Sequence, residues 1–323
     1  MNKPFLLRPA VKDYLWGGSR LNDDFNLGAD VSPFAEAWVC STHPDGVSTL
    51  DSGESLADVL RTHPEYMGSH AQAVADGQFP ILMKLIDARS DLSVQVHPDD
   101  DYARKYENGS LGKTEMWYVL DARPGARLVY GFRKNVEEED VRSAIEKGTV
   151  EKMLNYVPVE KNDLFMMEAG TVHAIGAGCL IAEIQESSNL TYRLYDYNRQ
   201  DKNGNLRPLH IDKALRVANL KSSAVPRQPM RVLRYANGAA AELLTRCKYF
   251  QVERIILNTE GRRLPKFRTE SNSFHVLLCV SGCGVILGEG TDIPFFKGDC
   301  IFVPADSEVL RLHGRAQLLN VSC

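Results

Sequence analysis

The sequence predicts a mainly β protein that contains two related β-barrels, and two observations favour this fold class. Short apolar runs, each bounded by Gly, Pro, Asn or Asp, follow one another along most of the chain. Many short strands with such turns between them are typical of barrels and sandwiches. In addition, a segment of the first half resembles a segment near the C-terminus, and an internal repeat indicates that one architecture occurs twice.

Ten runs have strand character, and helical spacing of apolar residues is confined to two places. The strand-like runs are residues 80–88, 92–98, 115–122, 127–132, 163–170, 179–185, 250–257, 274–282, 285–290 and 300–306. The helical spacing covers residues 55–68 and 136–156. We expect these two segments to form helices packed beside the β core.

The repeat relates residues 162–173 to residues 298–309, which align without a gap. In both copies an Asp opens an apolar run that ends at a turn. Residues 114–125 match residues 274–284 in a looser way. His173 ends the first copy and has no counterpart in the second, so we expect the second barrel to be a degenerate copy.

The sequence predicts two domains. Residues 219–230 are polar, contain two prolines and have no periodicity, which is typical of a linker. We place the boundary between 220 and 245 and divide the chain at 235. Residues 1–235 then form the first domain, with the helical insert at about 136–156, and residues 236–323 form the second. A length of 323 residues suits this division.

Composition and charge exclude several classes of partner. The chain has 38 basic and 42 acidic residues, interspersed along its length, so we expect no nucleic-acid partner. It has no apolar run of about 18 residues and no signal-peptide pattern, so we expect no membrane partner. Seven cysteines without a C-x-x-C pair indicate reduced, mostly packed thiols. We therefore expect a cytoplasmic protein.

The run SVQVHPDDDY (93–102) combines strand character with two polar side chains. Residues two apart in a strand point to the same side, so Gln95 and His97 project together, away from Val94 and Val96. Pro98 then ends the strand. Taken alone, such a His is more often a hydrogen-bonded core or surface residue than a metal ligand.

Two further residues favour a metal site. Glu115 opens the run EMWYVL, where a buried, unpaired carboxylate is costly, although an exposed strand end is an alternative. His173 follows the turn EAGT, which it can also simply cap. With Gln95 and His97 they form a nitrogen and oxygen donor set that suits zinc or another borderline divalent ion. His275 replaces Glu115 in the second copy without ligand-type neighbours, so we expect no second metal.

Several motifs resemble those of the type I phosphomannose isomerases, zinc-dependent members of the cupin superfamily. They are QVHPDD (95–100), K-x-E-x-W (113–117), G-T-x-H-A (170–174), S-x-x-x-x-R (188–193) and the early segment EAWVCSTHPDG (36–46). The resemblance covers most of the first barrel and is weak in the second. It implies two cupin-type (jelly-roll) barrels and the interconversion of D-mannose 6-phosphate and D-fructose 6-phosphate through a cis-enediol.

The resemblance also implies roles for individual residues. The metal ligands, for one Zn²⁺ per chain, fall on Gln95, His97, Glu115 and His173. The substrate-pocket positions fall on Lys84, Ser93, Lys113, Glu183 and Arg193. The partner is then a small sugar phosphate, and we expect a monomer or a weak homodimer.

The physical properties of three basic residues fit this pocket. A lysine inside the apolar run at Lys84 needs a phosphate or a carboxylate partner, unless it lies at a sheet edge with its amine in solvent. Lys113 shares a strand face with Glu115 if the strand extends that far; otherwise it is a loop lysine. The planar fork of Arg193 suits phosphate or a developing enediolate, or it only pairs with Asp196 or Glu183.

These properties lead to a division of labour. Lys84 and Ser93 are the expected phosphate contacts, and Arg193 and Lys113 add fixed positive charge. For the proton transfer we favour Glu183, with Lys113 or a zinc-bound water as alternatives.

Two other functions compete. A metal-dependent cupin dioxygenase is disfavoured by Gln95, because an amide is a weak donor for a metal that activates oxygen. A non-catalytic sugar-binding or regulatory cupin is disfavoured by the full ligand set together with Lys113 and Arg193. A coupled assay for fructose 6-phosphate separates these functions from the isomerase.

Overall fold

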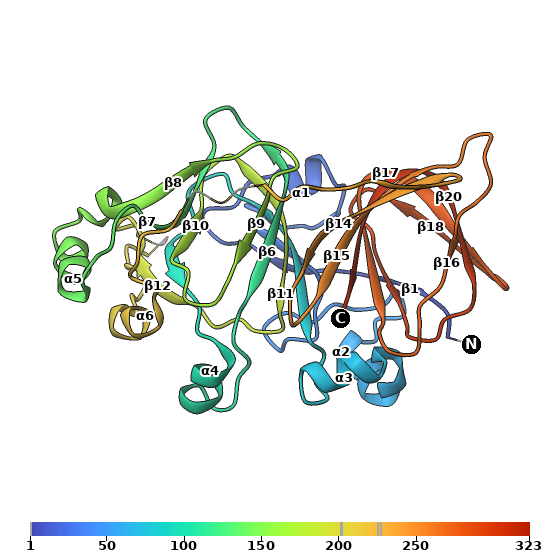
Figure 1. Ribbon diagram of the computed structural model, residues 1–323, viewed down its shortest axis with the longest axis horizontal. Coiled ribbons are helices and arrows are strands. Elements are labelled where there is room, and N and C mark those ends of the chain that lie inside the picture. The colour runs from blue at the N-terminus through green and yellow to red at the C-terminus, as the bar shows by residue number, and fades with distance from the viewer. Residues whose placement is uncertain (1, 201–202, 225, 227) are drawn as a thin grey trace.

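The computed structural model describes residues 2–200, 203–224, 226 and 228–323. Its strands form three sheets, of which two belong to the N-terminal part and the third makes up the C-terminal part (Figure 1). The mainly β fold predicted from the sequence is confirmed. Helices are short and lie outside the sheets (Figure 1).

The first barrel contains a five-stranded and a six-stranded antiparallel sheet. In spatial order, the five-stranded sheet holds β12 (Tyr192–Tyr195), β5 (Val94–Val96), β10 (His173–Ile175), β7 (Arg127–Phe132) and β8 (Leu154–Pro158). The six-stranded sheet holds β2 (Ala10–Lys12), β3 (Glu36–Cys40), β4 (Ile81–Asp87), β11 (Cys179–Glu186), β6 (Glu115–Ala122) and β9 (Leu164–Met167).

The two sheets pack through a shared apolar core. Ile86, Trp117 and Phe165 of the six-stranded sheet belong to one buried cluster with Leu128 and Ile175 of the five-stranded sheet. Each of these side chains is at most 1–2% exposed. Removal of this much apolar surface from water is the main force that holds the two sheets face to face.

The second barrel is a nine-stranded antiparallel sheet. Its strands, in spatial order, are β1 (Phe5–Leu7), β19 (Cys300–Val303), β17 (His275–Gly288), β20 (Leu310–Ser322), β15 (Gln251–Asn258), β14 (Ala239–Arg246) and β13 (Arg234–Ala236). In addition, β16 (Lys266–Phe267) pairs with β20, and β18 (Thr291–Phe296) pairs with β17.

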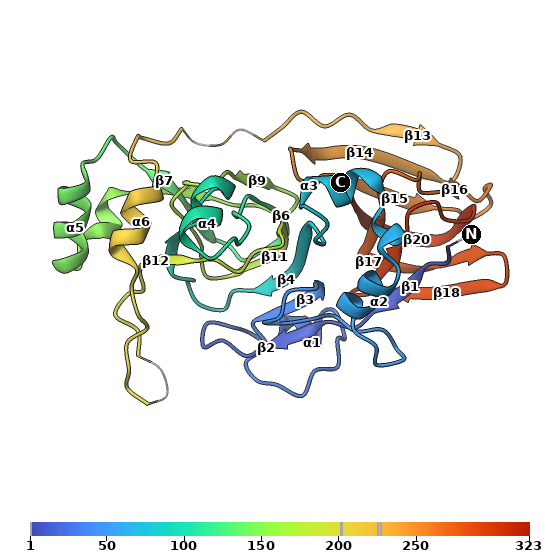
Figure 2. The ribbon, with the colours of Figure 1, turned by 90° about the horizontal axis from the view of Figure 1, so that it is seen from below.

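Two pairs of helices lie at separate places on the molecule, and the other helices lie elsewhere beside the sheets. The helices are α1 (Arg20–Asp23), α2 (Leu56–Thr62), α3 (Ser69–Val74), α4 (Asp100–Tyr106), α5 (Glu138–Glu146) and α6 (Ile211–Val217), with the 3-10 helices η1 (Pro64–Met67) and η2 (Val150–Met153). Figure 2 shows α5 and α6 side by side at one end of the first barrel. In the same view α2 and α3 lie close to the second barrel.

All ten predicted runs overlap strands, and the helix predicted at 55–68 is confirmed as α2 and η1. The second helical prediction, 136–156, was too long. Helix α5 stops at Glu146, and Gly148 follows with φ 64°, a left-handed conformation that ends helices. After η2 the chain enters β8, whose Leu154 pairs with Phe132 of β7. Tertiary pairing overrides the helical spacing of these apolar residues.

The first strand of the chain belongs to the second barrel. Phe5 and Leu7 of β1 pair with Phe302 and Cys300 of β19. Strand β13, in turn, spans the predicted division at 235. The division of the chain into 1–235 and 236–323 stays a prediction. Strand β1 lies within its first range but pairs with the second barrel.

The segment between α6 and β13 runs along one side of the molecule (Figure 2). It contains the predicted linker 219–230, of which residues 225 and 227 lie outside the described part. The Ser223 N–H donates to the Phe132 carbonyl, and Gln228 exchanges hydrogen bonds with the backbone of Leu164. These contacts attach the segment to the first barrel.

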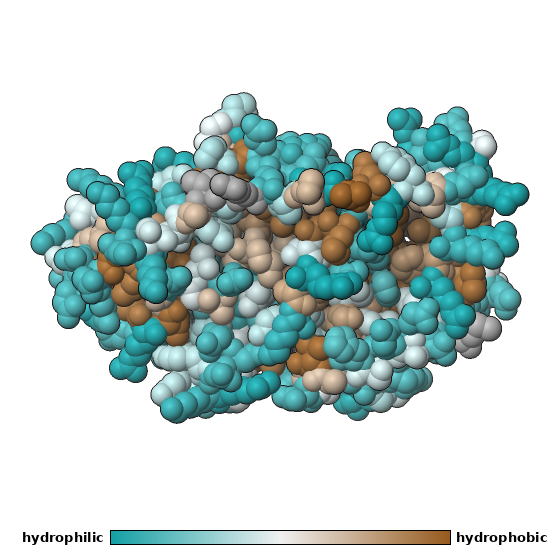
Figure 3. All heavy atoms as spheres, viewed as in Figure 1, coloured by the Kyte–Doolittle hydropathy of each residue, from teal (hydrophilic) through white to brown (hydrophobic). Residues whose placement is uncertain are grey.

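The surface carries no extended apolar band on the face in Figure 3, where small hydrophobic areas lie within a mostly hydrophilic surface. Over the described residues, every helix is too short or too polar to cross a membrane.

We expect Phe302→Ala to lower the free energy of unfolding by about 3–5 kcal/mol, because it opens a cavity in a close-packed core. Phe302 is fully buried and stacks on Phe5 at 5.2 Å and on Phe274 at 5.4 Å between ring centroids. Urea denaturation measures the change. The control is Phe296→Ala, since Phe296 is 62% exposed in the same barrel. Equal losses in both variants would contradict the prediction.

Candidate active site

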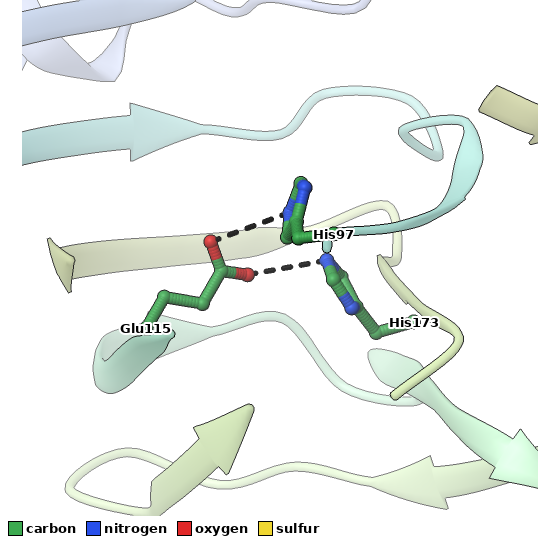
Figure 4. A group of neighbouring side chains, drawn as sticks. All are labelled: His97, Glu115 and His173. Carbon is green, nitrogen blue, oxygen red and sulfur yellow. Dashed lines mark ion pairs between the residues drawn. The ribbon is translucent and has the colours of Figure 1, made fainter. Parts of the chain in front are cut away.

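The centre of the site is formed where the two sheets of the first barrel face each other. His97 directly follows β5 and His173 begins β10, both in the five-stranded sheet, while Glu115 begins β6 in the six-stranded sheet. Figure 4 shows the two imidazoles side by side, each with one nitrogen directed at one carboxylate oxygen.

The three side chains are close together and buried. The Glu115 carboxylate lies 3.2 Å from His173 Nε2 and 3.6 Å from His97 Nε2. Glu115 has no exposed surface, and the two histidines are at most 2% exposed. Both Nε2 atoms and Glu115 Oε1 lack a hydrogen-bond partner among the described residues, whereas Glu115 Oε2 faces the Lys113 ammonium at 2.8 Å. Buried polar atoms without partners are rare, and together these three are suited to a bound cation.

The outer nitrogens of the two rings set their orientation. His97 Nδ1 lies 2.7 Å from the Leu190 carbonyl, and His173 Nδ1 lies 2.8 Å from the Thr171 carbonyl. A carbonyl only accepts, so each Nδ1 carries the proton and donates. Each Nε2 then presents its lone pair to the centre, which is the arrangement of metal-binding histidines.

The electrostatics of this group favour an ionised Glu115 carboxylate and a neutral His97 imidazole. Burial opposes ionisation of Glu115, but the Lys113 ammonium and the two imidazoles outweigh it and hold the pKa of Glu115 well below its usual value. Burial, followed by repulsion from Lys113, holds the pKa of His97 well below its usual value. A carboxylate and an unprotonated imidazole are the forms that bind metal.

Gln95, the fourth predicted ligand, lies beside the three-residue group. It is in β5, and its Cα pairs in register with His173 of β10 and with Arg193 of β12. Its side chain is half-buried, with Oε1 3.4 Å from Ser93 Oγ. Gln95 therefore lies two residues before His97 and directly across from His173 in the sheet.

A line of alternating charges leads away from Glu115. The Lys113 ammonium lies 2.8 Å from Glu115 and 3.8 Å from Glu183. The Lys84 ammonium lies 3.0 Å from Glu183 Oε1. Glu183 Oε2 accepts a hydrogen bond of 2.9 Å from Trp117 Nε1. The four charged side chains are at most 4% exposed, so each depends on its neighbours for compensation.

Lys84 has a carboxylate partner. The sequence predicted that its partner is either a phosphate or a carboxylate. Besides Glu183, its ammonium lies 3.9 Å from Glu36 Oε2, which accepts a hydrogen bond of 2.7 Å from Trp38 Nε1. Burial lowers the pKa of Lys84, but Glu183 and Glu36 outweigh it and the net pKa is raised. The alternative of a solvent-exposed edge lysine was wrong, because β4 is interior to its sheet.

Glu36 and Trp38 were not predicted as site residues. The only signal for them was the E-x-W pattern inside EAWVCSTHPDG, one of the motifs that resemble the type I phosphomannose isomerases. Spacing along the chain does not reveal that β3 lies next to β4, where Trp38 and Lys84 are register partners.

A cavity of about 290 Å³ opens beside the three-residue group of His97, Glu115 and His173. It is lined by Tyr14, Trp16, Glu36, Lys84, Ile86, Leu92, Ser93, Gln95, Lys113, Ile175, Glu183, Asn189, Thr191, Arg193 and Arg207. All five predicted pocket residues are in this set, together with Gln95. Charged and polar side chains of both signs converge on a small space, as in sites for small polar ligands.

Arg193 reaches the cavity from β12. Its Nη1 donates a hydrogen bond of 2.9 Å to the Pro208 carbonyl, while Nε has no partner among the described residues. Burial and the nearby Arg207 lower the pKa of Arg193. Asp196, one of its expected acid partners, instead binds Arg207 at 2.7 Å. Part of the Arg193 fork is therefore free for a ligand.

Comparisons with known proteins agree with this geometry. The family model for the phosphomannose isomerase type I catalytic domain matches residues 5–121, and that for the mannose-6-phosphate isomerase cupin domain matches residues 240–323. The chain is 34% identical to the mannose-6-phosphate isomerase ManA of Bacillus subtilis (strain 168), over 98% of each protein. The chain belongs to the type I phosphomannose isomerases.

Solved structures extend the comparison to the fold. The mannose 6-phosphate isomerase from Bacillus subtilis matches with a TM-score of 0.87 and 31% identity over 100% of both chains. A mannose 6-phosphate isomerase bound with zinc and yttrium matches with a TM-score of 0.74 over 98% of both chains, at 16% identity, which shows the fold alone. The predicted pair of cupin-type barrels is confirmed.

Membership in this isomerase family identifies the chain as an enzyme with a sugar phosphate as substrate class. It leaves the dioxygenase and the non-catalytic cupin without support. His275 in the second barrel has a hydrogen-bond partner of its own, since its Nδ1 lies 2.7 Å from Asn320 Oδ1. The expected absence of a second metal stays a prediction.

We expect Lys84→Met to lower the free energy of unfolding by about 3–5 kcal/mol, because Glu183 and Glu36 lose a buried cation. The matched control is Lys12→Met. Both ammonium groups lie over the Trp38 ring, at 4.7 Å for Lys12 and 5.0 Å for Lys84, but Lys12 is partly exposed. For Lys12 we expect a change below about 1 kcal/mol by urea denaturation. Equal changes would mean that the buried ion pairs add nothing.

Proposed function

We propose that this isomerase interconverts D-mannose 6-phosphate and D-fructose 6-phosphate in the cavity beside His97, Glu115 and His173, with one zinc ion per chain. One observation carries the proposal. Three buried atoms of these residues, the two Nε2 atoms and Glu115 Oε1, lack hydrogen-bond partners among the described residues, and they adjoin a small cavity lined by lysine, arginine and carboxylate side chains.

The residues that would hold zinc are His97, Glu115, His173 and Gln95. Two imidazole nitrogens with carboxylate and amide oxygens fit zinc's preference for nitrogen and oxygen ligands. The likeness to an isomerase bound with zinc and yttrium supports the choice of metal. When bound, zinc supplies a Lewis acid that stabilises negative charge on the oxygens of the open-chain sugar.

Glu183 is the proposed proton carrier. Its carboxylate takes the proton from C2 of the open-chain aldose, the C2–H electron pair forms the C1–C2 double bond, and O1 gains a proton, which gives the cis-enediol. The proton then returns to C1 while O2 loses its proton, and the product is the ketose. Trp117 and Lys84 hold this carboxylate from two sides, which fixes its position for both transfers.

Lys113 and Arg193 are proposed to stabilise the charge that develops on O1 and O2. The Lys113 ammonium is desolvated and already positioned by Glu115, so it does not reorganise during the reaction. Arg193 offers a planar fork with an unused Nε–H.

For the phosphate group we propose Ser93 and Lys84, as the resemblance implies. Ser93 lines the cavity, where its hydroxyl donates a long hydrogen bond of 3.4 Å to Gln95 Oε1 and can accept another. The Lys84 ammonium lies between Glu183 and Glu36, which leaves one of its three N–H donors for a phosphate oxygen. We propose that its larger contribution is to hold Glu183 in place.

The remaining proposals concern the state of the protein. We propose two domains, 1–235 and 236–323, and a monomer or weak homodimer in the cytoplasm. All seven cysteines are free thiols, which supports a reducing compartment. Light scattering after size exclusion measures the oligomeric state.

His97→Ala should remove metal and activity together. Loss of even a group that orients a metal ligand costs about 10–100-fold, so loss of a ligand should cost more than about 100-fold in turnover. Metal analysis and a coupled assay for fructose 6-phosphate measure the two effects. His70→Ala, at an exposed position of α3, is the control. Full turnover in a metal-free His97→Ala protein would exclude the mechanism.

Arg193→Ala should keep its zinc while kcat falls by about 10²–10³-fold, because a fixed positive group near the developing charge is lost. Arg193→Lys keeps the charge without the planar fork, so its kcat should lie between those of the wild type and the alanine variant. Steady-state kinetics with metal analysis test this. Unchanged kinetics for Arg193→Ala would remove this residue from the site.

A further inference from the structure

The segment that carries Lys113 is held at three consecutive backbone N–H groups. Gly112 donates to Asp100 Oδ1 at 3.0 Å, Lys113 donates to the Pro98 carbonyl at 3.0 Å, and Thr114 donates to Glu186 Oε1 at 2.7 Å. Two side-chain carboxyls thus hold the residues directly before and after Lys113.

The segment packs tightly against the start of α4. A Cβ added at Gly112 would lie 2.5 Å from the backbone nitrogen of Asp100 and from the carbonyl carbon of Asp99, closer than atoms approach. Only glycine permits this approach. The position of Lys113 is therefore coupled to the position of Asp100.

The two carboxyls continue into the second barrel. Asp100 and Glu186 are 7% and 2% exposed, and their carboxyls lie close enough that Asp100 raises the pKa of Glu186. The Tyr249 hydroxyl donates to Asp100 Oδ2 at 3.0 Å, and the Lys248 ammonium lies 3.4 Å from the same oxygen. Tyr249 and Lys248 lie in the turn between β14 and β15, so they reach Asp100 from the other barrel.

We propose that Tyr249 of the second barrel, acting through Asp100 and Glu186, positions Lys113 beside Glu115 for catalysis. The inference rests on the proposed role of Lys113 and adds three positioning residues to the site, none of which touches the cavity. It also assigns a task to the second barrel, which contributes no residue to the cavity lining.

The closeness of the two buried carboxyls makes this connection sensitive to pH. Burial and the nearby Asp100 raise the pKa of Glu186 to about 8. A raised carboxyl pKa means that the stabilising protonated form is present at low pH and is lost as pH rises through about 8. Charged and titratable groups that face Glu186 are Asp100 of α4 and Cys247 and Tyr249 of the turn, while Lys248 of the same turn faces Asp100. Lys248 is exposed, so solvent weakens its compensation.

Two variants of the full-length, metal-loaded enzyme test the proposal. Tyr249→Phe removes the hydroxyl, and we expect kcat to fall by about tenfold, the rate equivalent of one hydrogen bond to a charged group. Bound metal and KM should not change, because neither ligand nor substrate is touched. The control is Tyr235→Phe, 80% exposed on β13 of the same barrel, which should match the wild type.

Glu186→Gln keeps an acceptor for Thr114 and a donor for Asp100 but has no proton to lose. We expect the decrease in kcat above pH 8 to be present in the wild type and absent in this variant. Glu186→Leu, which lacks both groups, should lose kcat at every pH. This profile stands independently of whether Tyr249→Phe folds.

The outcomes separate this inference from the proposed function. A wild type without turnover of mannose 6-phosphate would overturn the function. An active wild type with unchanged kcat in metal-loaded Tyr249→Phe, or with the same alkaline decrease in Glu186→Gln, would overturn the positioning role alone.

Discussion

Burial of the Glu115 carboxylate is the constraint on which the rest of the site depends. A carboxylate without solvent exposure is tolerated only when cations or strong donors surround it. The structure supplies Lys113 from the same chain segment and two imidazoles from the opposite sheet. The apolar core sets the distance between the two sheets. That distance therefore also sets how His97, Glu115 and His173 lie relative to one another.

The same requirement for compensation extends outward from Glu115. Lys113 also forms an ion pair with Glu183, and Glu183 forms one with Lys84. Lys84 in turn pairs with Glu36. Each residue of this series is buried and fixes the next, so the cavity is built before substrate enters. A site whose charges are already positioned does not have to reorganise as charge develops on the sugar oxygens.

The second barrel has a different relation to the chemistry. It lacks a counterpart of His173, and its His275 is hydrogen-bonded to Asn320 instead. It nevertheless contacts the catalytic half through β1 and through the turn that carries Tyr249.

The sequence by itself determined central strands such as β4, β6 and β11, the repeat and the motif that holds His97, because alternation and turn residues act over a few neighbouring positions. It did not predict others, such as β14 and β20. It also placed Lys84 in an apolar run that required a partner. Only the tertiary structure decided that the partner is Glu183, that Leu154 enters a strand rather than a helix, and that Phe5 pairs with Phe302. These contacts join residues far apart in the chain, and their energies depend on distance and burial, which local patterns do not encode.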